Sequence, residues 1–79
     1  MLTVDDAKAN ISANLKRILK DRGMTVYDLV RRTGAPQNSV YRVVRGENEP
    51  GATLLAQIAE ALDVSIERLM SFPDKTKIS

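Results

Sequence analysis

Apolar residues recur at helical spacing in five stretches of the chain, and residues typical of caps or turns separate these stretches. In the first stretch the apolar positions are Ile11, Leu15, Ile18 and Leu19. Their spacing predicts a helix over about residues 4–22, which ends at Gly23. Thr3 followed three residues later by Asp6 is typical of a capping box, so we expect the helix to begin just after Thr3.

Two shorter helical stretches follow, with only a short turn between them. Thr25 and Asp28 have the spacing of a second capping box, and the apolar residues after Thr25 predict a helix that ends near Thr33. Gly34 is suited to the positive φ that often stops a helix. The next helix is expected over about residues 36–45, because a second glycine and the loop-like stretch ENEPG follow it.

The remaining chain predicts two more helices and a tail. Periodicity indicates an amphipathic helix over about residues 52–62, and Ser65 is placed to cap a last short helix. Strand alternation and internal repeats are absent from the sequence. A chain of 79 residues is long enough for one small domain. We therefore predict a single all-α domain of five helices over residues 1–71, followed by a flexible tail or linker over residues 72–79.

The helix expected over residues 36–45 has one apolar side and one hydrogen-bonding side. At about 100° per residue, the apolar side carries Val40, Val43 and Val44. The opposite side carries Asn38, Arg42 and Arg45, with Tyr41 beside them and Gln37 in the first turn. Arginine, glutamine and asparagine can form bidentate hydrogen bonds to guanine or adenine edges in the major groove. The pattern favours a helix that reads DNA, while an ordinary amphipathic surface helix is the alternative interpretation.

The net charge of +2 conceals an uneven distribution. Residues 8–45 contain nine basic and two acidic residues, a net charge of +7, whereas residues 46–79 contain three basic and six acidic residues, a net charge of −3; Asp5 and Asp6 complete the total. A basic half and an acidic half on so small a domain favour contact with a polyanion on one side. Charges that only solvate helix surfaces would give the same counts, so the charge supports the DNA interpretation without establishing it.

The composition argues against catalysis, cofactors and membrane insertion. The chain has no histidine and no cysteine, and no serine or threonine lies in a recognisable nucleophile motif. Metal-ligand spacings and phosphate-binding glycine loops do not occur, so we expect no enzyme, no cofactor and no metal. The lack of cysteine fits a reducing compartment. No signal peptide is recognisable and no apolar run approaches the ~20 residues of a membrane span, so we expect a cytoplasmic protein without a membrane partner.

The helix pair and the segment after it resemble the Cro/lambda-repressor (XRE) helix-turn-helix family. The stretches that carry the resemblance are MTVYDLVRRTGAPQNSVYRVVRGENEP and LLAQIAEALDVSIERLM. Leu29, Gly34, Val40 and Val43 fall at the motif's usual hydrophobic and glycine positions, with the helix-turn-helix unit at about residues 26–45. The resemblance covers about residues 12–71. It implies a compact five-helix, lambda-repressor-like DNA-binding domain that acts as a homodimer on a near-palindromic operator in double-stranded DNA.

The same resemblance implies roles for particular residues. The residues implied in contact with bases are Gln37, Asn38 and Arg42, with Ser39 and Tyr41 as further candidates. Many relatives are basic in the loop where this chain has Glu47 and Glu49. This departure moves the implied contacts with the DNA backbone onto Thr25, Arg45 and Asn48. Apart from the resemblance, the last helix and its flank carry more apolar surface than is needed to cover the neighbouring helices, which predicts a two-fold dimer interface made by Ile66, Leu69, Met70 and Phe72. The alternative is that these residues only close the core of the monomer.

Three functions are compatible with this sequence. The first is a DNA-binding transcriptional regulator, most simply a repressor of phage or prokaryotic type. The second is an antitoxin, which would bind both its operator and a toxin protein. The third is a protein-interaction module that has lost DNA binding, and the presence of Gln37, Asn38 and Arg42 argues against it.

Overall fold

A computed structural model describes residues 3–73 of the chain, and within this range it contains five helices and no strand. The helices are α1 (Val4–Asp21), α2 (Val26–Thr33), α3 (Gln37–Arg45), α4 (Ala52–Leu62) and α5 (Ile66–Met70). The all-α fold and the five predicted helices are confirmed, with ends that differ from the predicted ones by about one residue. The prediction of a flexible tail falls mostly on residues 74–79, which lie outside the described residues.

Local hydrogen bonds explain where the helices begin. At the start of α1, the backbone N–H of Asp6 donates to Thr3 Oγ1 at 3.0 Å, and the Thr3 N–H donates to the Asp6 carboxylate at 3.2 Å. Thr25 and Asp28 form the same reciprocal pair at the start of α2. Both capping boxes are therefore confirmed, and each satisfies N–H groups that have no partner inside the helix.

Two glycines with positive φ lie at the ends of α2 and α3. Gly34 has φ 71° and ends α2, and Gly46 has φ 79° and ends α3. A Cβ atom at Gly46 would lie 3.3 Å from Ser12 Cβ of α1. Residue 46 therefore needs glycine for two reasons, the backbone conformation and the close approach of α1.

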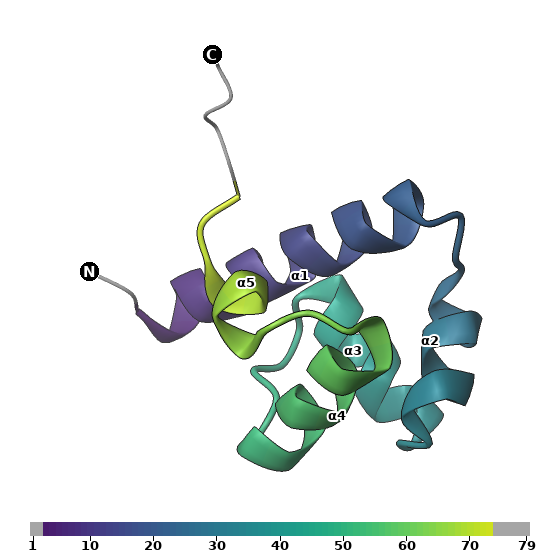
Figure 1. Ribbon diagram of the computed structural model, residues 1–79. Helices are drawn as coiled ribbons and strands as arrows, with labels where there is room; N and C mark the ends of the chain where they lie inside the picture. Colours follow the sequence, from purple (N-terminus) through teal and green to yellow (C-terminus); the bar gives the residue numbers. More distant parts are fainter. Residues whose placement is uncertain (1–2, 74–79) are drawn as a thin grey trace.

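The helices converge on one apolar core (Figure 1). α1 packs against α3 and α5, α2 packs against α3 and α4, and α4 also contacts α5. The side chains that are almost completely buried come from every helix: Ile11, Leu15, Leu29, Val40, Val43, Ile58, Leu62 and Leu69. Burial of these aliphatic side chains is the main favourable contribution to folding of so small a domain.

Polar side chains of α1 hold the neighbouring helices in place. The Asn14 amide donates to the carbonyl oxygens of Leu69 and Ser71, both at 2.7 Å, and the Asn10 amide donates to Met70 O at 3.1 Å. These bonds satisfy carbonyl groups at the end of α5, which has only five residues. The Ser12 hydroxyl similarly donates to the buried Val44 carbonyl, which ties the last turn of α3 to α1.

Candidate nucleic-acid interface

The two sides of α3 differ as the sequence predicts. Val40, Val43 and Val44 are buried in the core, with Val40 at 0% exposure. Gln37, Asn38, Arg42 and Arg45 are exposed, whereas Ser39 and Tyr41 are half-buried. The buried valines fix α3 to the rest of the domain, so the exposed polar side is presented on a rigid support.

A short turn of defined geometry connects α2 to α3. The Thr33 hydroxyl donates to Val30 O at 3.0 Å and accepts from the Ala35 N–H at 3.1 Å. Leu29 is fully buried, and α2 packs against α3. Pro36 lies directly before the first residue of α3, so the helix begins one residue later than the start predicted at about residue 36. The two helices and this turn form a helix-turn-helix unit.

The polar groups at the start of α3 are free to bind a ligand. Within the part of the chain that the structure describes, the side chains of Gln37, Asn38 and Arg42 make no hydrogen bond or ion pair. All three are exposed, so water satisfies them in the free protein. Their donors and acceptors are therefore available for base edges.

Arg45, at the end of α3, has two partners within the domain. Its guanidinium carbon lies 5.7 Å from the centroid of the Tyr41 ring, within the range of a cation–π contact. Its Nη1 atom lies 3.5 Å from Glu47 Oε2, and both side chains remain half-exposed or more. Asn48 follows in the same loop and is exposed, as are Glu47 and Glu49.

The start of α2 combines open N–H groups with a carboxylate. Thr25, an expected backbone contact, uses both its hydroxyl and its N–H in the capping box with Asp28. The pKa of Asp28 is lowered, first by the hydrogen bond from the Thr25 backbone and then by the Thr25 side chain. The charges of Arg32 and Arg31 lower this pKa further, while desolvation opposes the shift. Asp28 is therefore ionised at neutral pH, and a phosphate that approaches the start of α2 meets its negative charge.

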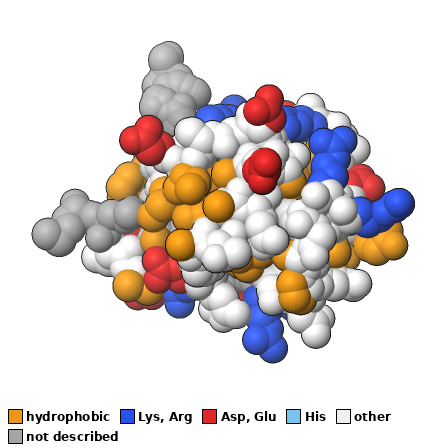
Figure 2. Space-filling model, turned by 60° about the horizontal axis from the view of Figure 1, so that its bottom comes forward, with side chains coloured by type: hydrophobic (Ala, Val, Ile, Leu, Met, Phe, Trp, Pro, Cys, Tyr) orange, Lys and Arg blue, Asp and Glu red, His pale blue; other side chains and the backbone are white. Residues whose placement is uncertain are grey.

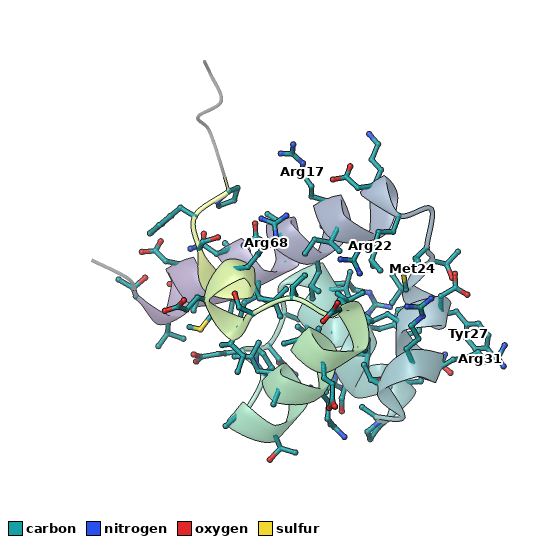
Figure 3. The ribbon with its side chains drawn as sticks, viewed as in Figure 1. Arg17, Arg22, Met24, Tyr27, Arg31 and Arg68 are labelled. Atoms are coloured by element: carbon teal, nitrogen blue, oxygen red, sulfur yellow. The ribbon has the colours of Figure 1, made fainter. Side chains whose placement is uncertain are left out.

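The remaining basic residues are distributed over several surfaces. Arg31 projects from the outer side of α2 together with the exposed Tyr27, as Figure 3 shows, and Arg32 is exposed on the same helix. On α1, Arg17 Nε lies 3.8 Å from Asp21 Oδ2. The Arg22 side chain donates to the Leu62 carbonyl, a structural role that the sequence analysis missed because the two residues are far apart in the chain.

The expected dimer interface is only partly on the surface. Ile66 and Phe72 are 41% and 56% exposed, and Met70 is half-buried. Leu69 is 0% exposed, because it faces the core between α1 and α4. The prediction that Leu69 contacts a partner is therefore corrected: it closes the core of the single chain. On the face shown in Figure 2, apolar side chains gather in a patch left of the centre, and Lys and Arg side chains lie mostly along the upper, right and lower edges.

Neither a membrane-spanning helix nor a metal site is found among residues 3–73. No helix there combines the length and the apolar character needed to cross a bilayer. In the same residues, acidic side chains do not gather in a group that could hold a metal ion.

Comparisons with known proteins identify a family model that matches most of the chain and proteins that are similar to it in sequence or in fold. The model of the Cro/C1-type HTH DNA-binding domain matches residues 14–75 of the chain. The uncharacterised HTH-type transcriptional regulator y4dJ of Sinorhizobium fredii is 28% identical over 71 residues, which cover 90% of this chain and 92% of that protein. The crystal structure of the hypothetical transcription factor NHTF from Neisseria superposes with a TM-score of 0.79 at 23% identity, covering 92% of this chain and 85% of that one. At this identity the structural likeness establishes the fold alone.

Proposed function

The chain belongs to the Cro/C1-type helix-turn-helix family and is a DNA-binding transcriptional regulator, and from this premise we propose that it represses transcription by reading a near-palindromic operator with α3. A small domain seated in the major groove over a promoter blocks other proteins there without any further activity. Repression is therefore the simplest consequence of binding. Since the ligand is DNA, we place the protein in the cytoplasm and propose no catalytic activity.

One observation carries this proposal: α3 is buried on one side and has unengaged hydrogen-bonding groups on the other. Gln37 and Asn38 lie in its first turn, the part of a recognition helix that points into the groove. Arg42 lies one turn after Asn38 on the same side. We propose that these three residues contact base edges. Ser39 and Tyr41 are half-buried, so we propose that they contact DNA only at the edge of the groove.

Contacts with the DNA backbone are proposed at two places, the end of α3 and the start of α2. Arg45 and Asn48 lie at its end and in the following loop, where both are exposed. At the start of α2 we propose that Thr25 acts indirectly. The Thr25 hydroxyl is already engaged with Asp28, so its part is to fix the first turn of α2, whose N–H groups donate to a phosphate. The negative charge of Asp28 weakens this contact without abolishing it.

We also propose a homodimer that uses Ile66, Phe72 and the exposed part of Met70. These apolar side chains are exposed around α5, where water would otherwise cover them. A two-fold dimer on a near-palindromic site would place its two copies of α3 about 34 Å apart, one turn of DNA. The antitoxin alternative has no residue group of its own to support it among those described.

Selection from random double-stranded oligonucleotides, followed by mobility-shift titration, tests this function. The wild-type protein should select a consensus with two inverted half-sites. The Gln37→Ala variant should lose preference at one base pair in each half-site. Gln57→Ala, which removes the same side chain from α4, is the matched control and should leave the consensus unchanged. Selection of no consensus by the folded wild-type protein would contradict the proposal.

A further inference from the structure

The three residues Tyr41, Arg45 and Glu47 form a connected group at the end of α3. The Arg45 guanidinium lies over the ring of Tyr41, which precedes it by one helical turn. Glu47 Oε2 lies 3.5 Å from Arg45 Nη1. Arg42, on the same exposed surface, has no carboxylate partner among the described residues. Of the two arginines on α3, Arg45, which is proposed to contact the DNA backbone, is thus both oriented and partly neutralised within the domain.

The loop after α3 adds a second unusual feature, because it is acidic where contact with phosphates is proposed. Glu47 and Glu49 are both exposed there, so the loop presents two acidic side chains to the solvent. Carboxylates on a DNA-facing surface repel phosphates, and non-specific affinity arises mainly from phosphate neutralisation. A carboxylate in this position should therefore reduce binding to any DNA unless other contacts hold the protein on its site.

We propose that Glu47 is a positioning residue that acts through Arg45 and lowers affinity for non-operator DNA more than for the operator. This inference rests on the proposed function of α3. In a loosely bound, non-specific complex, Arg45 remains paired with Glu47 and contributes little to phosphate neutralisation. In the operator complex, α3 is fixed in the groove, and a phosphate meets the guanidinium N–H groups that Glu47 leaves open.

The chemistry of the guanidinium makes this selective contact feasible. A guanidinium has five N–H donors in a planar fork, so one edge can hold a carboxylate while another holds a phosphate. Tyr41 and Glu47 orient Arg45 before DNA arrives, which reduces the ordering that the docked complex requires. The Arg45–Glu47 pair is exposed, and it engages only the Nη1 atom, so the other N–H groups of the guanidinium stay accessible to phosphate.

The test compares two substitutions that remove the same charge from the same loop. Glu47→Gln abolishes the carboxylate that contacts Arg45, and Glu49→Gln is the matched control without that contact. Each variant is titrated with a random-sequence duplex and with the consensus duplex that the wild-type protein selects, over a range of salt concentrations. Thermal unfolding of each variant checks that the fold is retained.

Glu47→Gln should raise affinity for the random duplex about three- to tenfold and make its salt dependence steeper by about one unit of slope, because Arg45 can then neutralise one more phosphate. Affinity for the consensus duplex should change less than about twofold, so the specificity ratio falls. Glu49→Gln should change both duplexes by a similar, smaller factor. In the Arg45→Ala background, Glu47→Gln should no longer steepen the salt dependence.

Two outcomes separate this inference from the proposed function. If the wild-type protein selects no consensus, the proposed function fails and the inference fails with it. If a consensus is selected but Glu47→Gln and Glu49→Gln have equal effects on both duplexes, only loop charge matters and the role of Glu47 is overturned. A steeper salt dependence for Glu47→Gln that persists in the Arg45→Ala background would also overturn it, since the effect would then not pass through Arg45.

Discussion

The junction of α1 with α5 and the outer side of α3 use the same kinds of side chain in opposite ways. Asn14 donates to the Leu69 and Ser71 carbonyls and so is engaged within the fold, whereas Asn38 makes no such bond in the described part of the chain. Arg22 donates to the Leu62 carbonyl, whereas Arg42 extends from α3 without a partner there. Residue type alone therefore does not distinguish a structural group from a binding group.

The difference lies in what the neighbouring backbone requires. At the end of α5, carbonyl groups without helical partners need donors, and the α1 amides supply them. At the start of α3, the neighbouring backbone makes no bond to these side chains, so their hydrogen bonds remain available to a ligand. Arg45 is intermediate, because its partners Tyr41 and Glu47 are exposed and can be exchanged.

The largest expected effect separates core from surface within α5. Leu69→Ala should lower the free energy of unfolding by about 2–5 kcal/mol, because it leaves a cavity at a fully buried position. Ile66→Ala should change it by less than about 1 kcal/mol, since Ile66 is largely exposed, but should weaken the proposed dimer. Urea denaturation followed by circular dichroism measures the first quantity, and analytical ultracentrifugation measures the second. Equal loss of stability in both variants would show that α5 is not oriented as described.

The two arginines test the comparison by binding. Arg42→Ala should weaken binding to the consensus duplex by about 1–3 kcal/mol and relax its preference at one base pair in each half-site. Arg22→Ala should instead lower the free energy of unfolding by about 1 kcal/mol through loss of the bond to Leu62 O, and leave the selected consensus unchanged. Selection from random oligonucleotides and urea denaturation of both variants check this. An unchanged consensus for Arg42→Ala would show that it does not read bases.

The two asparagines test the same comparison with a smaller effect. Asn14→Ala should lower the free energy of unfolding by about 1–2 kcal/mol, because carbonyl groups at the end of α5 lose their donor and water reaches them only in part. Asn38→Ala should stay within about 0.5 kcal/mol of the wild-type stability while it weakens binding to the consensus duplex. Thermal unfolding and mobility-shift titration give the two values. A destabilised Asn38→Ala variant would mean that this amide also supports the fold.

The sequence predicts the local features of this molecule well. The five helices, both capping boxes and the buried valines of α3 follow from periodicity and from interactions over three or four residues. The two sides of α3 were predictable because its nine residues make more than two turns, with the three valines on one face and polar residues on the other. The proposed roles of the exposed residues on the other face remain predictions.

Features that depend on distant contacts could not be predicted. The five residues of α5 make little more than one turn, so periodicity cannot tell that Leu69 faces inward and Ile66 outward. The bonds from Asn14 join residues 55 and 57 positions apart, and no sequence pattern marks a side chain that donates to a distant carbonyl. The pairing of Arg45 with Glu47 spans only two residues but depends on the loop conformation after Gly46.

The smallest expected effect is that of pH on DNA binding. Between pH 6 and 8 the affinity for the consensus duplex should change less than about twofold, because the chain has no histidine and no cysteine, the side chains whose charge most often changes near neutral pH. The lowered pKa of Asp28 reinforces this expectation. A group whose pKa is lower in the folded state adds stability above its unfolded pKa of about 4, and this is lost only as the pH falls through the lower folded value. The capping box of α2 is therefore intact throughout the range from pH 6 to 8.

Raising the salt concentration should by contrast weaken DNA binding steeply, since counterion release drives the contact with phosphates. Titrations at fixed ionic strength over pH, and then at fixed pH over salt, measure both dependences. A tenfold effect of pH together with a weak effect of salt would show that a group other than the basic residues around α3 controls binding.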